Sequence, residues 1–396
     1  MFSTSSRYRF FLKNFQNFVF VAFTLCISIF SSISFAQDTP VFRIGTGATI
    51  GNYFPLGGII ASSISKPVGS RACEKGGSCG VDGLLSVSVS TQGSVSNVIG
   101  ISNGTLEGGF AQADVVFWAL RGEHVFRTRG AIGNLRSVAN LYPEAMHLVV
   151  GINSGIRSLE DLAEKNISIG PTGSGTNAAA QLLLETRGVR VPKEKMFTLS
   201  DSESYEAITS GEIDAFFIIA GTPARLVTVL TERHKARLLS LSKTDVEILE
   251  EIYPFFSGGT IGVGTYKNTS DTLALMVPAQ FLVREDLDDD LIYGITKALW
   301  HETTAANLAK GHTLGRFITK ETALDGLILP LHPGAKRFYQ EIGMIPEEEE
   351  TFEDEILDEE PMSAAEDDQT EDKETVGNDD TSTDSELVDG EEVVEE

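Results

Sequence analysis

The central part of this 396-residue chain repeats one pattern, in which a short apolar strand leads into a glycine-containing turn and then into a helix. Residues 41–44 alternate like a strand, glycines follow at 45–47, and residues 53–61 suit a helix. The same order returns at 84–102 and again from 167 onward. Strands that alternate with helices form a sheet covered by helices on both faces. The sequence therefore predicts an α/β fold with mainly parallel sheets.

The N-terminal residues have the composition of a targeting segment. Arg7, Arg9 and Lys13 precede an apolar run at 18–30, and small residues follow up to Ala36. This order is typical of a signal peptide, which we expect at residues 1–36 with cleavage after Ala36. The apolar run is shorter than the ~20 residues that span a bilayer. We therefore expect an exported protein.

The C-terminal residues 347–396 hold 25 Asp and Glu and one basic residue, Lys373. With so few apolar side chains, this segment is predicted to be a disordered acidic tail. It carries −24 of the chain's formal net charge of −26, so the acidity says nothing about the ligand. A tail that buffers calcium or binds a cationic partner is the alternative. We expect no nucleic-acid partner.

The residues between these two ends are more than one hydrophobic core usually supports. We predict a first lobe at 37–145, a second lobe at 146–278, and a segment at 279–346 that returns to the first lobe. The strand–helix pattern breaks around 141–144, which places the first crossing there. Within the returning segment, residues 290–310 are expected to form one long helix.

Three glycine turns, at 45–47, 92–94 and 173–176, are the candidate binding features. In α/β sheets the ligand lies beyond the carboxyl ends of the strands, where helix N-termini present unpaired N–H groups. Each turn offers backbone donors and a hydroxyl, which suit a carboxylate. A single glycine turn can also serve only to bend the chain. Three such turns in two lobes predict a site for a small carboxylate.

No catalytic motif is complete. Residues 170–176 resemble a phosphate-binding loop, but Gly175 stands where that loop needs a lysine. His301 is followed four residues later by Ala305 rather than by a second histidine, so a zinc-protease motif is excluded. Ser174 lacks the spacing of a nucleophile elbow. We expect no enzyme, no cofactor and no metal, and we assign structural roles to His147, His301 and His332.

Cys73 and Cys79 are the two cysteines that follow the predicted cleavage site. In an oxidising compartment, this pair is expected to form a disulfide that closes a small loop. Zinc needs more ligands than two cysteines without a neighbouring histidine.

Aromatic and acidic residues at the junctions are further candidates. Tyr53, Tyr142 and Phe217 can form the wall of a pocket or belong to the core. Asp114 and Glu144 can receive a ligand ammonium group, or can cap helices and pair with arginines.

Several segments resemble the TAXI family, the solute receptors of tripartite ATP-independent periplasmic (TRAP) transporters. The matching segments are GTGATIGNYFPLGG at 45–58, STQGSVSN at 90–97, FAQAD at 110–114, LYPE at 141–144, GSGT at 173–176 and DAFF at 214–217. Residues 73–81 resemble the immunogenic-protein branch of that family. The acidic tail departs from the family pattern, which ends near Gly343.

The resemblance implies a two-lobed type II periplasmic-binding-protein fold with a hinge. It implies that the protein captures a glutamate-like amino acid or an organic acid in the periplasm and delivers it to integral membrane TRAP subunits. The matching positions give the implied ligand set: Thr46, Gly47, Tyr53, Ser94, Gln112, Tyr142, Glu144, Ser174, Gly175, Thr176 and Phe217. Ser174 and Thr176, with their N–H groups, are expected to hold the ligand carboxylate. A two-lobed ligand sensor or a surface antigen without a transport role is the alternative, and an enzyme on the same scaffold is the less favoured one.

Overall fold

The computed structural model describes residues 41–346. The signal peptide with its cleavage site after Ala36 and the acidic tail, both predicted from the sequence, lie outside these residues. Within residues 41–346, no helix is long and apolar enough to cross a membrane.

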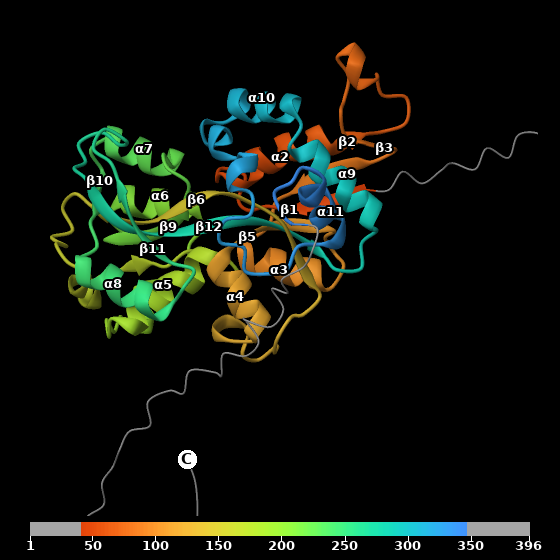
Figure 1. Ribbon diagram of the computed structural model, residues 1–396. Helices are drawn as coiled ribbons and strands as arrows, with labels where there is room; N and C mark the ends of the chain where they lie inside the picture. Colours follow the sequence, from red (N-terminus) through yellow and green to blue (C-terminus); the bar gives the residue numbers. More distant parts are fainter. Residues whose placement is uncertain (1–40, 347–396) are drawn as a thin grey trace, which may run out of the picture. The chain divides into compact units, whose positions relative to one another are not determined.

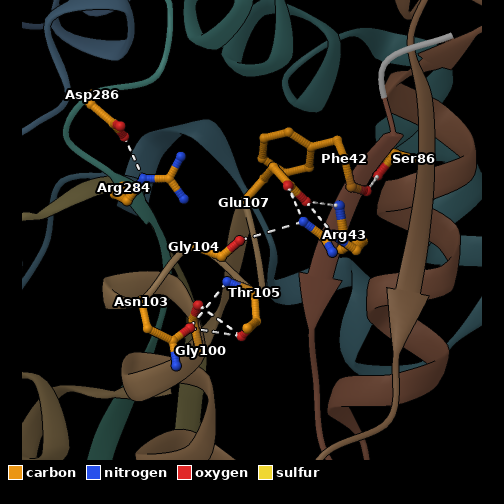
Figure 2. A network of polar contacts seen from close by, with 10 residues as sticks. All are labelled: Phe42, Arg43, Ser86, Gly100, Asn103, Gly104, Thr105, Glu107, Arg284 and Asp286. Atoms are coloured by element: carbon orange, nitrogen blue, oxygen red, sulfur yellow. Dashed lines mark hydrogen bonds and ion pairs between the residues drawn. The ribbon is translucent and has the colours of Figure 1, made fainter. Parts of the chain in front are cut away.

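A sheet of ten strands runs through the described residues (Figure 1). Its main path has the order β4-β1-β5-β12-β6-β9-β7-β8, while β10 pairs with β6 and β11 pairs with β12. The strands are β1 (Val41–Gly45), β4 (Leu85–Val89), β5 (Gly108–Gln112), β6 (Leu135–Gly151), β7 (Ile167–Ser168), β8 (Met196–Phe197), β9 (Ala215–Ala220), β10 (Ala236–Leu239), β11 (Ser257–Ile261) and β12 (Thr272–Arg284). A separate small sheet pairs β2 (Ser65–Lys66) with β3 (Val81–Asp82).

The two flanks of the sheet are parallel and its centre is antiparallel. In the first flank β1 pairs in parallel with β4 and β5, and in the second flank β7 pairs in parallel with β8 and β9. The central strands β6 and β12 run antiparallel to each other; β12 also pairs antiparallel with β5, and β6 also pairs antiparallel with β9. The α/β fold class predicted from the sequence is confirmed, and the parallel pairing occurs where strands alternate with helices.

The two central strands are long and connect both flanks. Residues 135–145 of β6 pair with β12, and residues 145–150 pair with β9. The expected lobe boundaries, near 145 and 278, fall inside these two continuous strands. The division into lobes stays a prediction.

Helices cover both faces of the sheet (Figure 1). The α-helices within residues 41–346 are α2 (Tyr53–Ile64), α3 (Ser94–Ser102), α4 (Ala113–Arg121), α5 (Gly175–Thr186), α6 (Asp201–Ser210), α7 (Arg225–Glu232), α8 (Lys243–Ile252), α9 (Asp289–Leu299), α10 (Glu302–Gly311) and α11 (Pro333–Glu341). Short 3-10 helices lie between them: η1 (Cys73–Lys75), η2 (His124–Phe126), η3 (Glu160–Glu164), η4 (Lys193–Lys195), η5 (Thr313–Phe317) and η6 (Lys320–Thr322). Helices α3, α4, α5 and α8 lie on one face, and the other α-helices lie on the opposite face.

The buried apolar side chains form three clusters. One cluster lies under α3, α4, α5 and α8 and extends across both flanks. On the opposite face, a second cluster lies under α2, α9 and α11, and a third lies under α6 and α7. Because neighbouring residues of a strand point to opposite faces, Phe217 of β9 enters the first cluster while Phe216 and Ile218 enter the third.

Two local expectations have clear outcomes. The disulfide between Cys73 and Cys79 is formed, which confirms the prediction. The single helix expected at 290–310 is wrong, because α9 ends at Leu299 and α10 begins at Glu302. His301 causes the restart locally, because its side chain accepts the N–H of Thr303 and caps the new helix.

Three packed rings connect the core of the first flank with α2. Phe281 of β12 packs edge-to-face on Phe110 of β5, with the ring centroids 5.6 Å apart. Phe110 packs in the same way on Tyr53, with the centroids 5.5 Å apart. Since Phe110 and Phe281 are fully buried, this stack fixes the first residue of α2.

The variant Phe281→Ala is expected to lower the free energy of unfolding by about 3–5 kcal/mol, because it leaves a cavity in the core. Denaturant titration of the purified protein measures this change. The control is Phe317→Ala, since that side chain is 43% exposed, and its expected change is within ~0.5 kcal/mol. Equal stability losses in the two variants would contradict the packing described.

Candidate functional site

A pocket of about 850 Å³, including its opening to solvent, lies where the strands of both flanks end. Turns that follow β1, β4, β7 and β8 contribute to it, together with the last residues of β5 and β9. The lining residues are Gly47, Ala48, Ile50, Gly51, Asn52, Tyr53, Thr91, Gln92, Gly93, Ser94, Gln112, Glu144, Pro171, Ser174, Gly175, Thr176, Ser200, Asp201, Ile218, Ile219, Ala220, Ala224, Arg225 and Leu226. The three glycine turns singled out in the sequence thus meet around one space.

Most of the site residues predicted from the sequence line this pocket. They are Gly47, Tyr53, Ser94, Gln112, Glu144, Ser174, Gly175 and Thr176. Three others lie outside the lining. Thr46 is fully buried and donates its hydroxyl to the carbonyl of Val89 at 2.7 Å. Phe217 and Tyr142 are both buried in apolar clusters.

The N-terminus of α5 forms one wall of the pocket. Ser174 caps this helix, because its Oγ accepts the N–H of Asn177 at 3.0 Å and donates to the carbonyl of Pro171 at 2.7 Å. The Oγ1 of Thr176 accepts the N–H of Ile219 at 3.0 Å. The amides of Gly175 and Thr176 are the first two of the helix, so they have no partner within it. An anion at this wall therefore meets backbone N–H groups and the positive end of the helix.

Hydrogen bonds connect the flanks at two places beside the pocket. The N–H of Ser96 in α3 donates to the carbonyl of Gly173 at 3.0 Å. The side-chain amide of Asn52 donates to the carbonyl of Gly221 at 3.1 Å. The turns of both flanks are therefore in contact around the pocket.

A buried carboxyl group, that of Glu144, forms the floor of the pocket. Glu144 is 2% exposed, and the hydroxyl of Tyr53 donates to its Oε2 at 2.7 Å. Burial raises the pKa of Glu144 to about 8; hydrogen bonds from Tyr53 and Gln112 oppose this shift, and the nearby carboxyl of Asp114 adds to it. Glu144 is therefore largely protonated at neutral pH, and a cationic group of a ligand would favour its ionised form.

Asp114 is a second buried carboxyl group, although it does not line the pocket. Its Oδ1 accepts the N–H of Val115 at 2.7 Å, while its Oδ2 has no hydrogen-bond partner among the described residues. Burial raises the pKa of Asp114 to about 7. Glu144 and Asp114 thus form an acidic pair whose carboxyls stay protonated at pH values at which exposed carboxyls are ionised.

Two charged residues of the lining, Arg225 and Asp201, do not belong to the glycine turns predicted from the sequence. Arg225 is the first residue of α7 and is exposed, and within residues 41–346 no ion pair or hydrogen bond engages its side chain. Asp201 is the first residue of α6, and burial raises its pKa. Both residues follow the end of a strand and begin a helix. The position between a strand end and a helix start was the available signal for both residues, although their turns lack the glycine pattern of the other three.

The buried hydroxyl of Tyr266 stabilises the turn before Arg225 by a hydrogen bond. Tyr266 accepts the N–H of Ala224 at 2.7 Å, and its hydroxyl lies 2.7 Å from Nε2 of His147. Burial lowers the pKa of His147 to about 4, so the imidazole is neutral at pH 7 and its Nε2 accepts the hydroxyl proton of Tyr266. This network agrees with the structural role expected for His147.

The chain is similar in sequence to a known family, because a sequence model of the NMT1-like family matches residues 44–343. Three solved structures are also similar. The alkanesulfonate-binding protein SsuA from Xanthomonas axonopodis pv. citri, bound to MOPS, is 16% identical over 76% of this chain and 84% of that chain, with a TM-score of 0.39. An ancestral arginine-binding protein bound to arginine is 16% identical over 70% and 96%, with a TM-score of 0.38. A TctC solute-binding protein from Polaromonas, without ligand, is 14% identical over 72% and 95%, with a TM-score of 0.40.

The buried carboxyls predict how stability depends on pH. The pKa of Glu144 in the folded protein lies above its ordinary value of 4.5. The stabilisation of the folded state that comes from this shift is therefore fully present below pH 4.5, and it is lost as the pH rises through about 8. Asp114 stabilises the folded state in the same way, because its pKa rises from 3.8 to about 7 on folding. The wild-type free energy of unfolding is therefore expected to fall between pH 5 and pH 8. In Glu144→Gln, which is neutral at every pH, this fall is expected to shrink by roughly 3 kcal/mol.

Denaturant titrations of both proteins at pH 5, 6.5 and 8 measure the effect. The control is Glu206→Gln, which removes an exposed carboxyl of α6 and is expected to keep the wild-type pH dependence. If Glu144→Gln also kept the wild-type dependence, Glu144 would not hold a proton in the folded protein.

Proposed function

The chain belongs to the NMT1-like family, and from this premise we propose that it is a solute-binding protein that captures a small carboxylate-bearing solute and delivers it to a membrane transporter. The observation that carries the proposal is the pocket between the two flanks. Its walls combine the N-terminus of α5 with the free guanidinium of Arg225, and its floor carries the carboxyl of Glu144. These groups suit a small molecule that bears charges of both signs.

The carboxylate of the solute is proposed to bind at the α5 wall. The hydroxyl of Ser174 already donates to Pro171, whereas the hydroxyl of Thr176 only accepts the N–H of Ile219. The available donors there are therefore the backbone amides of Gly175 and Thr176 and the hydroxyl proton of Thr176. Arg225 adds a full positive charge and a planar pair of donors that match a carboxylate. The proposed donors to the carboxylate are therefore the backbone N–H groups, the hydroxyl of Thr176 and the guanidinium of Arg225, while Ser174 acts as the cap of α5.

The opposite end of the solute is proposed to meet Glu144 and Tyr53. An ammonium group there would favour the ionised form of Glu144 and form an ion pair with it, which fits a glutamate-like amino acid. A hydroxyl or another neutral group would leave the carboxyl of Glu144 protonated, which fits an organic acid. Within residues 41–346, no histidine or cysteine lines the pocket. This composition supports binding rather than catalysis.

Transport in the periplasm by a TRAP-type system is the finer part of the proposal. It is supported by the TAXI-like segments at 45–58, 90–97 and 173–176, which supply most of the pocket's turns. It is supported further by the exported character of residues 1–36 and by the disulfide, which suits an oxidising compartment.

Thermal unfolding in the presence of candidate solutes tests the proposal. Amino acids, dicarboxylates and sugars are added separately to the purified protein. A bound solute at a hundred times its Kd adds about 2.7 kcal/mol of stability, so the unfolding temperature is expected to rise with the concentration of at least one carboxylate-bearing solute. Stabilisation by sugars only, or chemical turnover of a carboxylate, would contradict the proposal.

The variant Arg225→Gln tests the carboxylate contact. Loss of the guanidinium is expected to weaken binding of the stabilising carboxylate 10- to 100-fold, which equals about 1.4–2.8 kcal/mol. Isothermal titration calorimetry measures the affinity. Arg190→Gln is the matched control, because Arg190 is an exposed arginine outside the lining, and its affinity is expected to equal that of the wild type. Wild-type affinity in Arg225→Gln would remove Arg225 from the site.

A further inference from the structure

Outside the pocket, Cys73, Cys79 and His301 form a separate cluster of half-buried ligand-type side chains. Their ligand atoms all lie within 4.8 Å of one another. The cysteines lie in the loop between β2 and β3, and His301 precedes α10. No sequence pattern indicates this contact, because no histidine neighbours the cysteines along the chain. The reason for excluding zinc, too few ligands, therefore no longer holds.

The disulfide joins the two cysteines, and backbone hydrogen bonds order the turn that contains Cys73. The N–H groups of Lys75 and Gly77 both donate to the carbonyl of Ala72, at 3.0 Å each, and the N–H of Gly76 donates to the carbonyl of Cys73 at 2.9 Å. An added Cβ at Gly77 would lie 1.9 Å from the carbonyl oxygen of Arg71, so the backbone packs closely on itself here. The turn that carries Cys73 is therefore ordered by its own backbone as well as by the disulfide, and Cys79 follows six residues later along the same loop.

The positions of the cysteines also suit tetrahedral coordination. Two thiolates on one Zn²⁺ lie about 3.8 Å apart, given Zn–S bonds of about 2.3 Å at the tetrahedral angle. The Cα atoms of Cys73 and Cys79 are 4.8 Å apart, so rotation of the side chains provides this separation without a large movement of the backbone. The hydroxyl of Thr303 lies 3.8 Å from Sγ of Cys79 and is placed to bond a water molecule on the metal.

We propose that the reduced form of this loop is a metal site, in which Cys73, Cys79 and His301 bind one thiophilic divalent cation such as Zn²⁺, with water as the fourth ligand. Two thiolates and one imidazole form a donor set that zinc accepts. The Glu302 and Thr303 backbone that follows His301 then connects the metal directly to the start of α10.

The metal site would form in two successive steps, reduction of the disulfide and binding of the cation. A dithiol or a phosphine reduces the disulfide, which breaks the Sγ–Sγ bond and adds two electrons and two protons to give two thiols. The cation then displaces both thiol protons and binds the two thiolates. The disulfide form cannot bind in this way, because both sulfurs are used in the covalent bond.

Metal binding also affects α10. In the disulfide form, Nδ1 of His301 accepts the N–H of Thr303 at 3.2 Å and caps the helix. A neutral imidazole has a single lone pair on its two nitrogens, so it serves either the cap or the metal. The site therefore exchanges a helix cap for a metal ligand, and asparagine at this position would keep the cap while removing the ligand.

Titration of the purified protein with Co²⁺, a spectroscopic substitute for Zn²⁺, tests the proposal. The protein is reduced with a phosphine and compared with the oxidised protein. The reduced protein is expected to bind one equivalent of Co²⁺ with thiolate-to-cobalt charge-transfer absorption and the visible bands of four-coordinate cobalt, and Zn²⁺ is expected to displace it. Absence of this absorption in the reduced protein, or equal absorption in the oxidised protein, would overturn the proposal.

Variants identify the histidine. His301→Asn is expected to bind Co²⁺ at least tenfold more weakly, with less charge-transfer absorption per site. The matched control is His312→Asn, because His312 caps η5 through its Nδ1 and the N–H of Leu314 in the same way; its affinity is expected to equal that of the wild type. Denaturant titration of each reduced variant shows whether it is folded. Equal affinity in His301→Asn and His312→Asn would show that His301 is not a ligand.

Discussion

The antiparallel pair of β6 and β12 is the constraint on which the rest of the fold depends. The two parallel flanks have no direct pairing with each other, and these two strands connect them. Ala145 marks the change of flank, since it pairs with Met276 of β12 and with Ala220 of β9. Close to this point, Pro143 and Pro278 occupy partner positions, and neither can donate an N–H to the ladder. The floor residue Glu144 therefore lies where the partner strands change and the ladder has fewer donors.

The buried carboxyls at the floor of the pocket lower the stability of the folded protein, but they offer a binding partner to a cationic group of a ligand. A carboxyl as buried as Glu144 or Asp114 loses hydration, and an apolar residue of similar volume would avoid that cost. The fold offsets part of it with the hydroxyl of Tyr53, which the ring stack on Phe110 and Phe281 holds in place. A ligand cation would supply the missing counter-charge. Local conflict of this kind is expected at a binding site rather than in a core.

The sequence predicted the parts of this structure that depend on local chemistry. Glycine turns between strands and helices located Ser94, Ser174 and Gly175, because a strand end and a helix start coincide there. The alternation of side chains along a strand was also visible, but it does not tell which face meets the ligand. Phe217 therefore appeared to be a pocket candidate, whereas it packs under α5 and α8. The contact of His301 with the cysteines depends on distant segments, and no local pattern carries it.

The arrangement of the apolar clusters determines where the two flanks can separate. The cluster under α3, α4, α5 and α8 spans both flanks, so moving them apart on that face would expose shared apolar surface. On the opposite face, the cluster under α2, α9 and α11 is distinct from the one under α6 and α7. The hydrogen bond from Asn52 to Gly221 joins the flanks on this second face, between the start of α2 and the turn before α7. Opening there would break that hydrogen bond and the packing of Gly221 on Leu314 and Tyr142, but each cluster would stay intact. Opening at Ser96 and Gly173 would disturb a common core. For the proposed binding of a solute, entry beside Asn52 would therefore disturb less packing, and Asn52, Tyr53 and Arg225 all line the pocket.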